Sequence, residues 1–298
     1  MKLIKFQLSD WLMLLVVQIW ALNLSLIKIA LKELPPIPFN GIRLMFGSLV
    51  LIIWLLKVEG NLKVKREHLF KIIILSITGY TIYQYVFIKG INYTTVSNTA
   101  VIFGISPILI SIFSIMFKQE KIKPIAWVGI FLGFLGVYLT ISGKSGGFEI
   151  SASNIKGDIL ILLAVILWAH YSVSARPLLK FYSPLKFTAL TMSIGSVLFF
   201  PFSLAEVVKL DYSVISIKAW LFLAYSGVMG LAVGLILWFF SVKKVGNSQT
   251  AVYSNIQPIF SVLYAWVILS ESIPPALLLG GVIIILGIIF THMGRQHI

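Results

Sequence analysis

Ten stretches without a charged side chain constrain this chain more than any other feature of its sequence. They cover residues 11–27, 44–56, 72–88, 90–117, 124–143, 159–175, 187–205, 219–242, 245–270 and 272–294. A helix needs about 20 apolar residues to cross the hydrocarbon core of a bilayer. Nine stretches reach or approach that length, and residues 38–54 extend the short one, with Arg43 near its end, where it can snorkel to the headgroups. The sequence therefore predicts an all-α integral membrane protein with ten transmembrane helices.

The basic residues are distributed unequally between the two sides of this predicted topology. The chain carries 24 Lys and Arg against 10 Asp and Glu, a net charge of +14. Alternating the loops between sides places 16 basic residues on the side of the termini and 7 on the other. Basic residues concentrate in cytoplasmic loops of membrane proteins. We therefore expect a plasma-membrane protein with both termini in the cytoplasm, and this explains the charge better than nucleic-acid binding does.

Two segments of 24 residues repeat each other at a distance of 151 positions. SNTAVIFGISPILISIFSIMFKQE at 97–120 and SQTAVYSNIQPIFSVLYAWVILSE at 248–271 share eight identical residues without a gap. Earlier correspondences at a distance of 148 include Trp20 with Trp168 and Gly47 with Gly195. We predict a first five-helix repeat at 1–142, a linker at 143–157 that is rich in Gly and Ser, and a second five-helix repeat at 158–298.

An odd number of helices in each repeat has a topological consequence. The second repeat must enter the membrane from the opposite face, so the two halves are inverted relative to each other. Glu120 then lies in a cytoplasmic loop, whereas its counterpart Glu271 lies outside. Inverted repeats are typical of secondary transporters, in which they allow alternating access to a central site.

The repeated segments also carry a family resemblance. In each half the fourth helix contains S-x-T-A-V-x(5)-P and ends in Glu, and a Gly-rich fifth helix follows. This pattern resembles the EamA family of the drug/metabolite transporter superfamily over nearly the whole chain. The resemblance implies a ten-helix carrier, often an exporter of amino acids or other small metabolites. It also implies a cavity between the halves, lined mainly by helices 1, 3, 4, 6, 8 and 9, with helices 5 and 10 as scaffold.

Polar and aromatic side chains that recur on helical faces are the candidates for lining such a cavity. Tyr80, Tyr83 and Gln84 share one face of the third helix by their spacing. Polar groups that face lipid are costly, so this face should point inward. The complete predicted set is Trp20, Asn23, Tyr80, Tyr83, Gln84, Asn98, Trp168, His170, Tyr171, Trp238, Tyr253 and Gln257. The alternative role for each of them is hydrogen bonding and packing between helices.

Two prolines and one histidine are further candidates. Pro107 and Pro258 fall inside the predicted fourth and ninth helices, where a proline removes a backbone hydrogen bond and kinks the helix. His170 is the only side chain near the middle of a predicted span that titrates near neutral pH. Proton coupling and a neutral, hydrogen-bonded histidine are the two interpretations of His170.

The charge-free stretches bear on the class of function. They contain no Asp, Glu or Cys, whereas an intramembrane enzyme needs nucleophiles, metal ligands or paired carboxylates. We expect a transporter with no enzymatic activity, cofactor or metal, whose partners are a small solute and the bilayer and which is a monomer or a homodimer. Basic residues at helix ends favour neutral or zwitterionic solutes. A nucleotide-sugar or phosphate-ester carrier, a lipid flippase and a channel are the alternatives.

Overall fold

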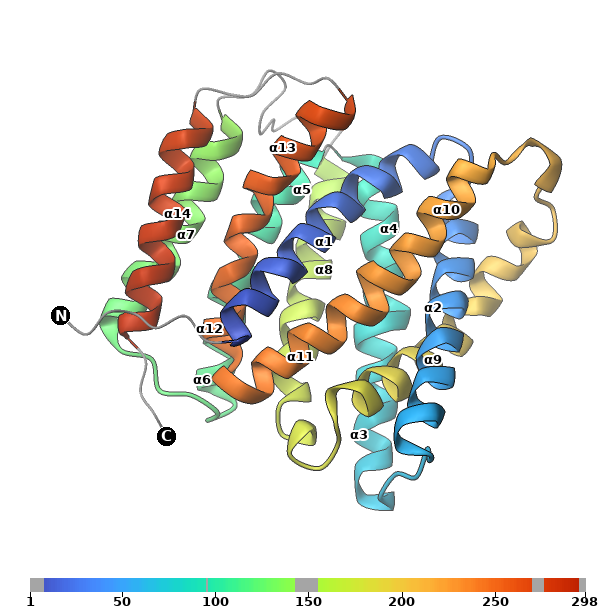
Figure 1. The fold of residues 1–298 in the computed structure, drawn as a ribbon, viewed down its shortest axis with the longest axis horizontal. Coiled ribbons are helices and arrows are strands. Elements are labelled where there is room, and N and C mark those ends of the chain that lie inside the picture. Colours follow the sequence, from blue (N-terminus) through green and yellow to red (C-terminus); the bar gives the residue numbers. More distant parts are fainter. Residues whose placement is uncertain (1–7, 95, 143–154, 270–275, 295–298) are drawn as a thin grey trace.

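The computed structural model describes residues 8–94, 96–142, 155–269 and 276–294, and these ranges form helices without a strand (Figure 1). Most of the predicted linker, residues 143–154, and Glu271 lie outside the described residues. The helices of the first half are α1 (Leu8–Ala30), α2 (Pro36–Glu59), α3 (Arg66–Ser76), α4 (Tyr83–Tyr93), α5 (Val96–Phe103), α6 (Ser106–Met116) and α7 (Pro124–Ser142). Those of the second half are α8 (Ile155–Ala175), α9 (Pro184–Val207), α10 (Ile217–Tyr225), α11 (Gly234–Val245), α12 (Asn247–Val252), α13 (Gln257–Leu269) and α14 (Ala276–Met293).

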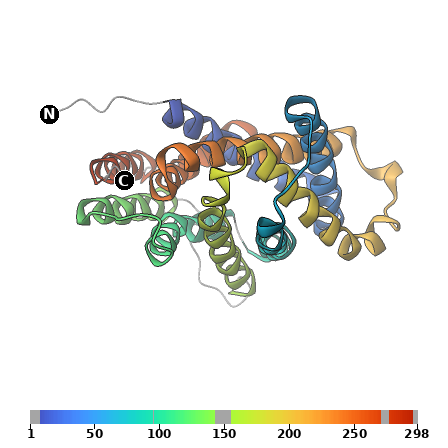
Figure 2. The same ribbon diagram turned by 90° about the horizontal axis from the view of Figure 1, so that it is seen from below.

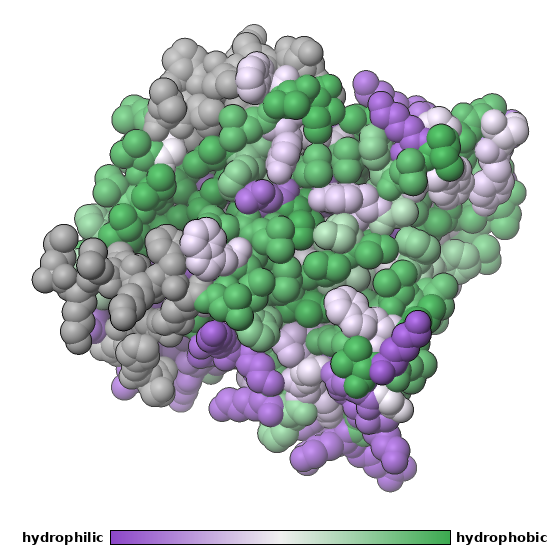
Figure 3. All heavy atoms as spheres, viewed as in Figure 1, coloured by the Kyte–Doolittle hydropathy of each residue, from purple (hydrophilic) through white to green (hydrophobic). Residues whose placement is uncertain are grey.

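Length and hydropathy identify the stretches that can cross a membrane. Seven stretches qualify: Leu8–Ala30, Pro36–Glu59, Arg66–Tyr93, Ile155–Lys180, Pro184–Val207, Ile217–Val245 and Asn247–Ile268. Three further apolar helices are shorter, so the count of ten crossings stays a prediction. Large apolar side chains such as Phe131, Val197 and Val282 are exposed on the outside of the bundle. Figure 3 shows hydrophobic residues across the middle of one face, with hydrophilic residues gathered toward its edges, as a membrane protein requires.

One long helical stretch in each half contains a π-helical segment. Segment η1 (Ile77–Ile82) joins α3 to α4, and segment η4 (Ser226–Val233) joins α10 to α11. The two segments overlap when the sequence is shifted by 151 positions, the same spacing as the repeated segments. A π-helical turn adds a residue to the helical turn and frequently occurs at a functional site. Both halves therefore widen their long helix at equivalent positions.

Both predicted proline kinks coincide with interruptions of a helix. Helix α5 ends at Phe103 and α6 begins at Ser106, so Pro107 is the second residue of α6. A 3₁₀ segment, η5 (Tyr253–Ile256), separates α12 from α13, and Pro258 is the second residue of α13. Proline is tolerated in the first turn of a helix, because its missing N–H would have no partner there. Each proline thus restarts a helix directly after a break.

The bundle brings the two ends of the described chain together. The Tyr253 hydroxyl donates a hydrogen bond of 2.9 Å to Asp10 at the start of α1, and it lies 3.3 Å from Nε2 of His292 near the end of α14. The start of α1 and the end of α14 therefore lie close together in the bundle. Helix α14 packs along α7 at the edge of the bundle (Figures 1 and 2).

Candidate functional site

A partly open cavity lies between the two halves of the bundle. Its walls come from α1, α2, η1, α4, α5 and α6 of the first half and from α8, η4, α11, η5 and α13 of the second. Of the predicted residues, those that border it are Trp20, Asn23, Tyr80, Tyr83, Gln84, Trp168, Tyr171 and Gln257. Pro258 also borders it, next to the break between η5 and α13. The cavity is thus surrounded by aromatic rings, amides and hydroxyls from helices that are distant in sequence.

Two tryptophans, one from each half, form one wall of the cavity, and a third lies behind them. Trp20 and Trp168 meet edge to face with 5.8 Å between ring centroids. Trp238 lies behind them, 5.4 Å from Trp20 and 5.2 Å from Trp168, and it is completely buried. Its indole N–H donates to Ser172 at 2.9 Å, and the indole of Trp20 donates to the carbonyl of Gly230 at 2.8 Å. Trp238 therefore supports the cavity wall and does not border the cavity itself.

Two tyrosines form a second wall, and their hydroxyls are hydrogen bonded. Tyr171 donates to Tyr80 at 3.4 Å and lies 3.0 Å from the hydroxyl of Thr191. The Tyr80 and Tyr171 rings pack edge to face at 5.5 Å. Buried hydroxyls that are hydrogen bonded in this way avoid the free-energy cost of an unpaired polar group. This wall is therefore held in one arrangement by packing and hydrogen bonds together.

Arg43 also borders the cavity, although the sequence suggested a position near the headgroups. It is only 1% exposed and lies in α2, about two turns after the helix begins. Its Nη2 donates to the Gln84 side-chain oxygen at 2.7 Å, and its Nη1 donates to the Ser226 hydroxyl at 3.0 Å. Sequence reasoning missed this residue because hydropathy places Arg43 along a helix but gives no information on which neighbouring helix it contacts.

Three of the predicted residues lie away from the cavity. Asn98 donates to both carboxylate oxygens of Asp158, at 3.1 and 3.0 Å, and Tyr253 donates to Asp10. His170 is half-buried, and its ring packs edge-on against Phe117 at 6.2 Å. Asp10 and Asp158 are equivalent in the two repeats and lie near the starts of α1 and α8. Asn98 and Tyr253 therefore link the helices that are interrupted near Pro107 and Pro258 to the first turns of α8 and α1 through hydrogen bonds.

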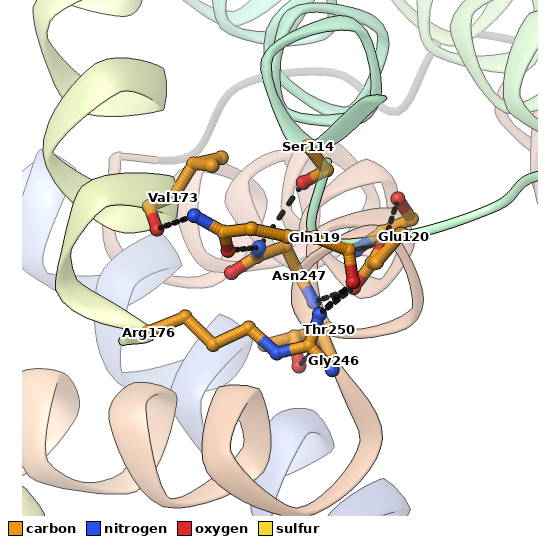
Figure 4. A network of polar contacts seen from close by, with 9 residues as sticks. Ser114, Gln119, Glu120, Val173, Arg176, Gly246, Asn247 and Thr250 are labelled. Carbon is orange, nitrogen blue, oxygen red and sulfur yellow. Dashed lines mark hydrogen bonds and ion pairs between the residues drawn. The ribbon is translucent and has the colours of Figure 1, made fainter. Parts of the chain in front are cut away.

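A polar cluster ties α6, α8 and α12 together at one end of the bundle (Figure 4). The Glu120 carboxylate accepts hydrogen bonds from Arg176 at 3.0 Å and from the backbone N–H groups of Asn247 and Ser248. Asn247 also donates to the hydroxyl of Ser114 at 3.1 Å. A carboxylate is favoured at a helix N-terminus, where free N–H groups carry partial positive charge. We call Ser114, Glu120, Arg176, Asn247 and Ser248 the Glu120 cluster.

Within the described ranges, no three His, Asp or Glu side chains approach one another closely enough to hold a metal ion. The groups that the cavity offers to a ligand are aromatic surfaces, amides, hydroxyls and one guanidinium group.

Comparison with known proteins identifies a family to which this sequence is similar. The model of the EamA-like transporter family matches residues 7–142 and again residues 155–293. An uncharacterized transporter of Archaeoglobus fulgidus is 27% identical over 94% of this chain and 95% of its own length. The uncharacterized transporter YetK of Bacillus subtilis is 26% identical over 91% of this chain and 82% of its own length. One crystal structure superimposes with a TM-score of 0.80, covering 96% of this chain and 97% of the other, at 18% identity.

Proposed function

Because the chain belongs to the EamA-like transporter family, we propose that it is a secondary transporter for small amphipathic solutes, amino acids or similar neutral or zwitterionic metabolites. We propose export from the cytoplasm as the direction. The observation that carries this proposal is the cavity, whose walls combine aromatic surface with a few polar groups from both halves. Such a combination is typical of sites for small ligands, in which apolar walls supply affinity and sparse polar groups fix orientation.

The proposed mechanism is alternating access between two inverted five-helix repeats that together cross the membrane ten times. Contacts at equivalent positions support the internal symmetry. Gly79 of η1 packs against Tyr171 of α8, and Gly230 of η4 packs against Asn23 of α1. The glycines are 151 positions apart and their partners are 148 positions apart, the two spacings found in the repeats. The same contact is therefore made twice, once on each side of the cavity.

A second pair of contacts follows the same symmetry. A Cβ atom added at Gly47 would lie 2.7 Å from the carbonyl oxygen of Gly227, and one added at Gly195 would lie 2.8 Å from that of Ser76. Gly47 and Gly195 are equivalent, as are Ser76 and Gly227. In each half a helix thus approaches the π-helical stretch of the other half at a glycine. Two equivalent contacts of this kind support two equivalent conformations of the whole molecule.

The Glu120 cluster is a set of contacts that must break if the proposed alternation of access takes place. It joins the first half to the second at one end of the bundle, through Glu120 and Arg176. Alternating access to the cavity from that end requires α6 and α12 to separate, which breaks these hydrogen bonds. The proposal therefore treats the conformation in Figure 4 as closed at the Glu120 end.

The phosphate-ester alternative from the sequence fits the cavity less well. A carrier of phosphate esters needs several basic groups to balance the phosphate charge. Arg43 is the only charged side chain among the cavity-lining residues that the structure describes. This consideration favours a carrier of small solutes.

The test is efflux from proteoliposomes loaded with labelled amino acids and nucleobases, measured with and without an imposed pH gradient. We expect saturable loss of the amino-acid class. Loss that ignores the gradient would identify uniport and leave His170 a structural role, whereas loss driven by the gradient would make His170→Ala the decisive variant. Loss that does not saturate would contradict a carrier and favour a channel.

A further inference from the structure

We propose that Arg43 binds a carboxylate group of the transported solute, so that the solutes are monocarboxylates with an apolar or aromatic body. This inference rests on the proposed function and names the solute class within it. Four observations support it: the charge balance around Arg43, its unused hydrogen-bond donors, the neutral acceptor that holds its guanidinium, and the composition of the surrounding walls.

The charge of Arg43 has no counterpart in its surroundings. Its hydrogen-bond partners, Gln84 and Ser226, are both neutral, and Phe39 lies 5.6 Å away under the guanidinium. In the described part of the chain, no carboxylate forms an ion pair with it. Removing an arginine from water without a counter-charge costs several kcal/mol in a real protein. An anionic ligand would remove that cost, whereas a neutral ligand would leave it in place.

The guanidinium also has hydrogen-bond donors to spare. Arginine carries five N–H groups in a planar fork that matches a carboxylate. Gln84 and Ser226 use one donor each, and the Nε atom is buried without a partner. Buried polar atoms in native proteins are nearly always hydrogen bonded, so an unpaired one calls for a functional explanation. The unused donors at Arg43 fit a ligand that the site holds only part of the time.

Gln84 occupies the position that the carboxylate would take. Its side-chain oxygen lies 2.7 Å from Nη2 of Arg43, and its own carbonyl oxygen accepts from Asn40 at 3.2 Å. The hydrogen bond from Asn40 holds the backbone of Gln84 and does not involve its side chain. A neutral amide oxygen is a weaker acceptor for a guanidinium than a carboxylate oxygen. A solute carboxylate can therefore replace Gln84 at Arg43.

The other walls of the cavity determine which apolar or aromatic body the solute can have. Tyr83 borders the cavity next to Gln84, its ring centroid lies 6.1 Å from that of Trp168, and Trp20 borders the cavity as well. Aromatic rings stack favourably on apolar and aromatic groups. One guanidinium balances one negative charge, which favours a carboxylate over a doubly charged phosphate. Amino acids with apolar or aromatic side chains and simple aromatic acids both meet these conditions.

The experiment compares acids with their amides, which have the same shape without the charge. We would measure dissociation constants of the full chain in lipid nanodiscs for phenylacetate and phenylacetamide, for phenylpropanoate and its amide, and for phenylalanine and phenylalaninamide. In the unmodified chain we expect each acid to bind about 10-fold or more tightly than its amide, the range for hydrogen bonds to charged groups. In Arg43→Gln we expect the ratio to fall to about one, because no charge remains to distinguish them.

Two further variants keep the test decisive if Arg43→Gln fails to fold. Gln84→Glu leaves Arg43 in place and adds a carboxylate at the position that the solute would take, so the preference for acids should also disappear. Lys28→Gln is the matched control, because Lys28 is a half-buried cation of α1 that donates to the carbonyl of Ile91 away from the cavity. It should keep the preference. Loss of the preference in Lys28→Gln, its survival in Gln84→Glu, or no binding of any acid by the unmodified chain would overturn the proposal.

Exchange of the same labelled compounds across proteoliposome membranes separates this inference from the proposed function. Acids that bind with an Arg43-dependent preference but are not exchanged would support the binding site and contradict transport. Equal exchange of acids and amides would support transport and contradict the role of Arg43.

Discussion

The two π-helical segments have the same type of backbone conformation but carry different side chains. Segment η1 brings Tyr80 to the cavity, and Tyr83 and Gln84 follow directly after it, whereas η4 brings Gly230 and Leu231. Each segment nevertheless makes the same glycine contact with a helix of the opposite half. Of the two π-helical stretches, the one in the first half therefore contributes the polar side chains, whereas the glycine of the one in the second half leaves room in the cavity.

This difference teaches that symmetry of the backbone and symmetry of the site are separate matters. Inverted repeats that exchange conformations need equivalent helix contacts, because each half must be able to adopt the arrangement of the other. A solute has no such symmetry, so its binding groups can come from one half.

The largest effect is expected at the tryptophans that the two halves share. Trp238→Ala should cost about 3–5 kcal/mol of unfolding free energy, since it leaves a large cavity behind the wall. Trp20 borders the cavity and is only half-buried, so Trp20→Ala should cost less stability but more ligand affinity. Chemical unfolding in detergent and ligand titration measure the two effects. Equal losses of stability would contradict the placement of Trp238 behind the wall.

The equivalent glycines should respond equally. Gly47→Ala and Gly195→Ala each place a methyl group against a backbone carbonyl oxygen, and overpacking of this kind costs about 1–3 kcal/mol. Gly281→Ala is the matched control, because its new methyl group would lie 3.5 Å from Ile259, an ordinary contact. Thermal unfolding should show two similar decreases and no decrease in the control. A decrease at only one of Gly47 and Gly195 would argue against equivalent contacts.

The Glu120 cluster should control access from its end of the bundle. Glu120→Gln keeps the shape but removes the charge from its hydrogen bonds, a loss of about 1–2 kcal/mol, which corresponds to a rise of about 5- to 30-fold in the open population. The chain has no cysteine, so Ser111→Cys provides a single buried thiol near the cluster for labelling. We expect faster labelling of this thiol in Glu120→Gln.

The control for this experiment is Glu206→Gln, which makes the same change of charge at an exposed position in α9. It should leave the labelling rate of Ser111→Cys unchanged. A rate that ignores Glu120→Gln would show that the cluster does not hold this end closed.

The smallest effect is expected at a surface contact between the halves. Glu33 follows α1 and accepts from the backbone N–H of Ser216 at 2.7 Å and from its hydroxyl at 3.0 Å. The hydrogen bond from the Ser216 backbone, then that from its hydroxyl, lowers the pKa of Glu33. The contact therefore stabilises the fold above the ordinary glutamate pKa of about 4.3 and is lost as the pH falls below it. Thermal unfolding across this range should be slightly less pH-dependent in Glu33→Gln. An unchanged pH dependence would contradict the contact.

The membrane class, the family and the repeated segments could be recognised from the amino-acid sequence alone. Hydropathy sums local residue properties, so charge-free stretches indicate helices that lie in lipid without any knowledge of their neighbours. Spacing along a helix also placed Tyr80, Tyr83 and Gln84 on one face, and all three border the cavity. The motif with Pro107 and Pro258 marked the positions where the structure breaks a helix.

Which of these side chains contact one another depends on how the helices pack in the tertiary structure. Arg43 and Gln84 are 41 residues apart, and Arg43 and Ser226 are 183 apart, so no local pattern could pair them. The burial of Trp238 behind Trp20 and the position of His170 beside Phe117 depend likewise on how separate helices are rotated against each other. Helix rotation is set by packing across the whole bundle, and packing joins residues that the chain itself keeps far apart.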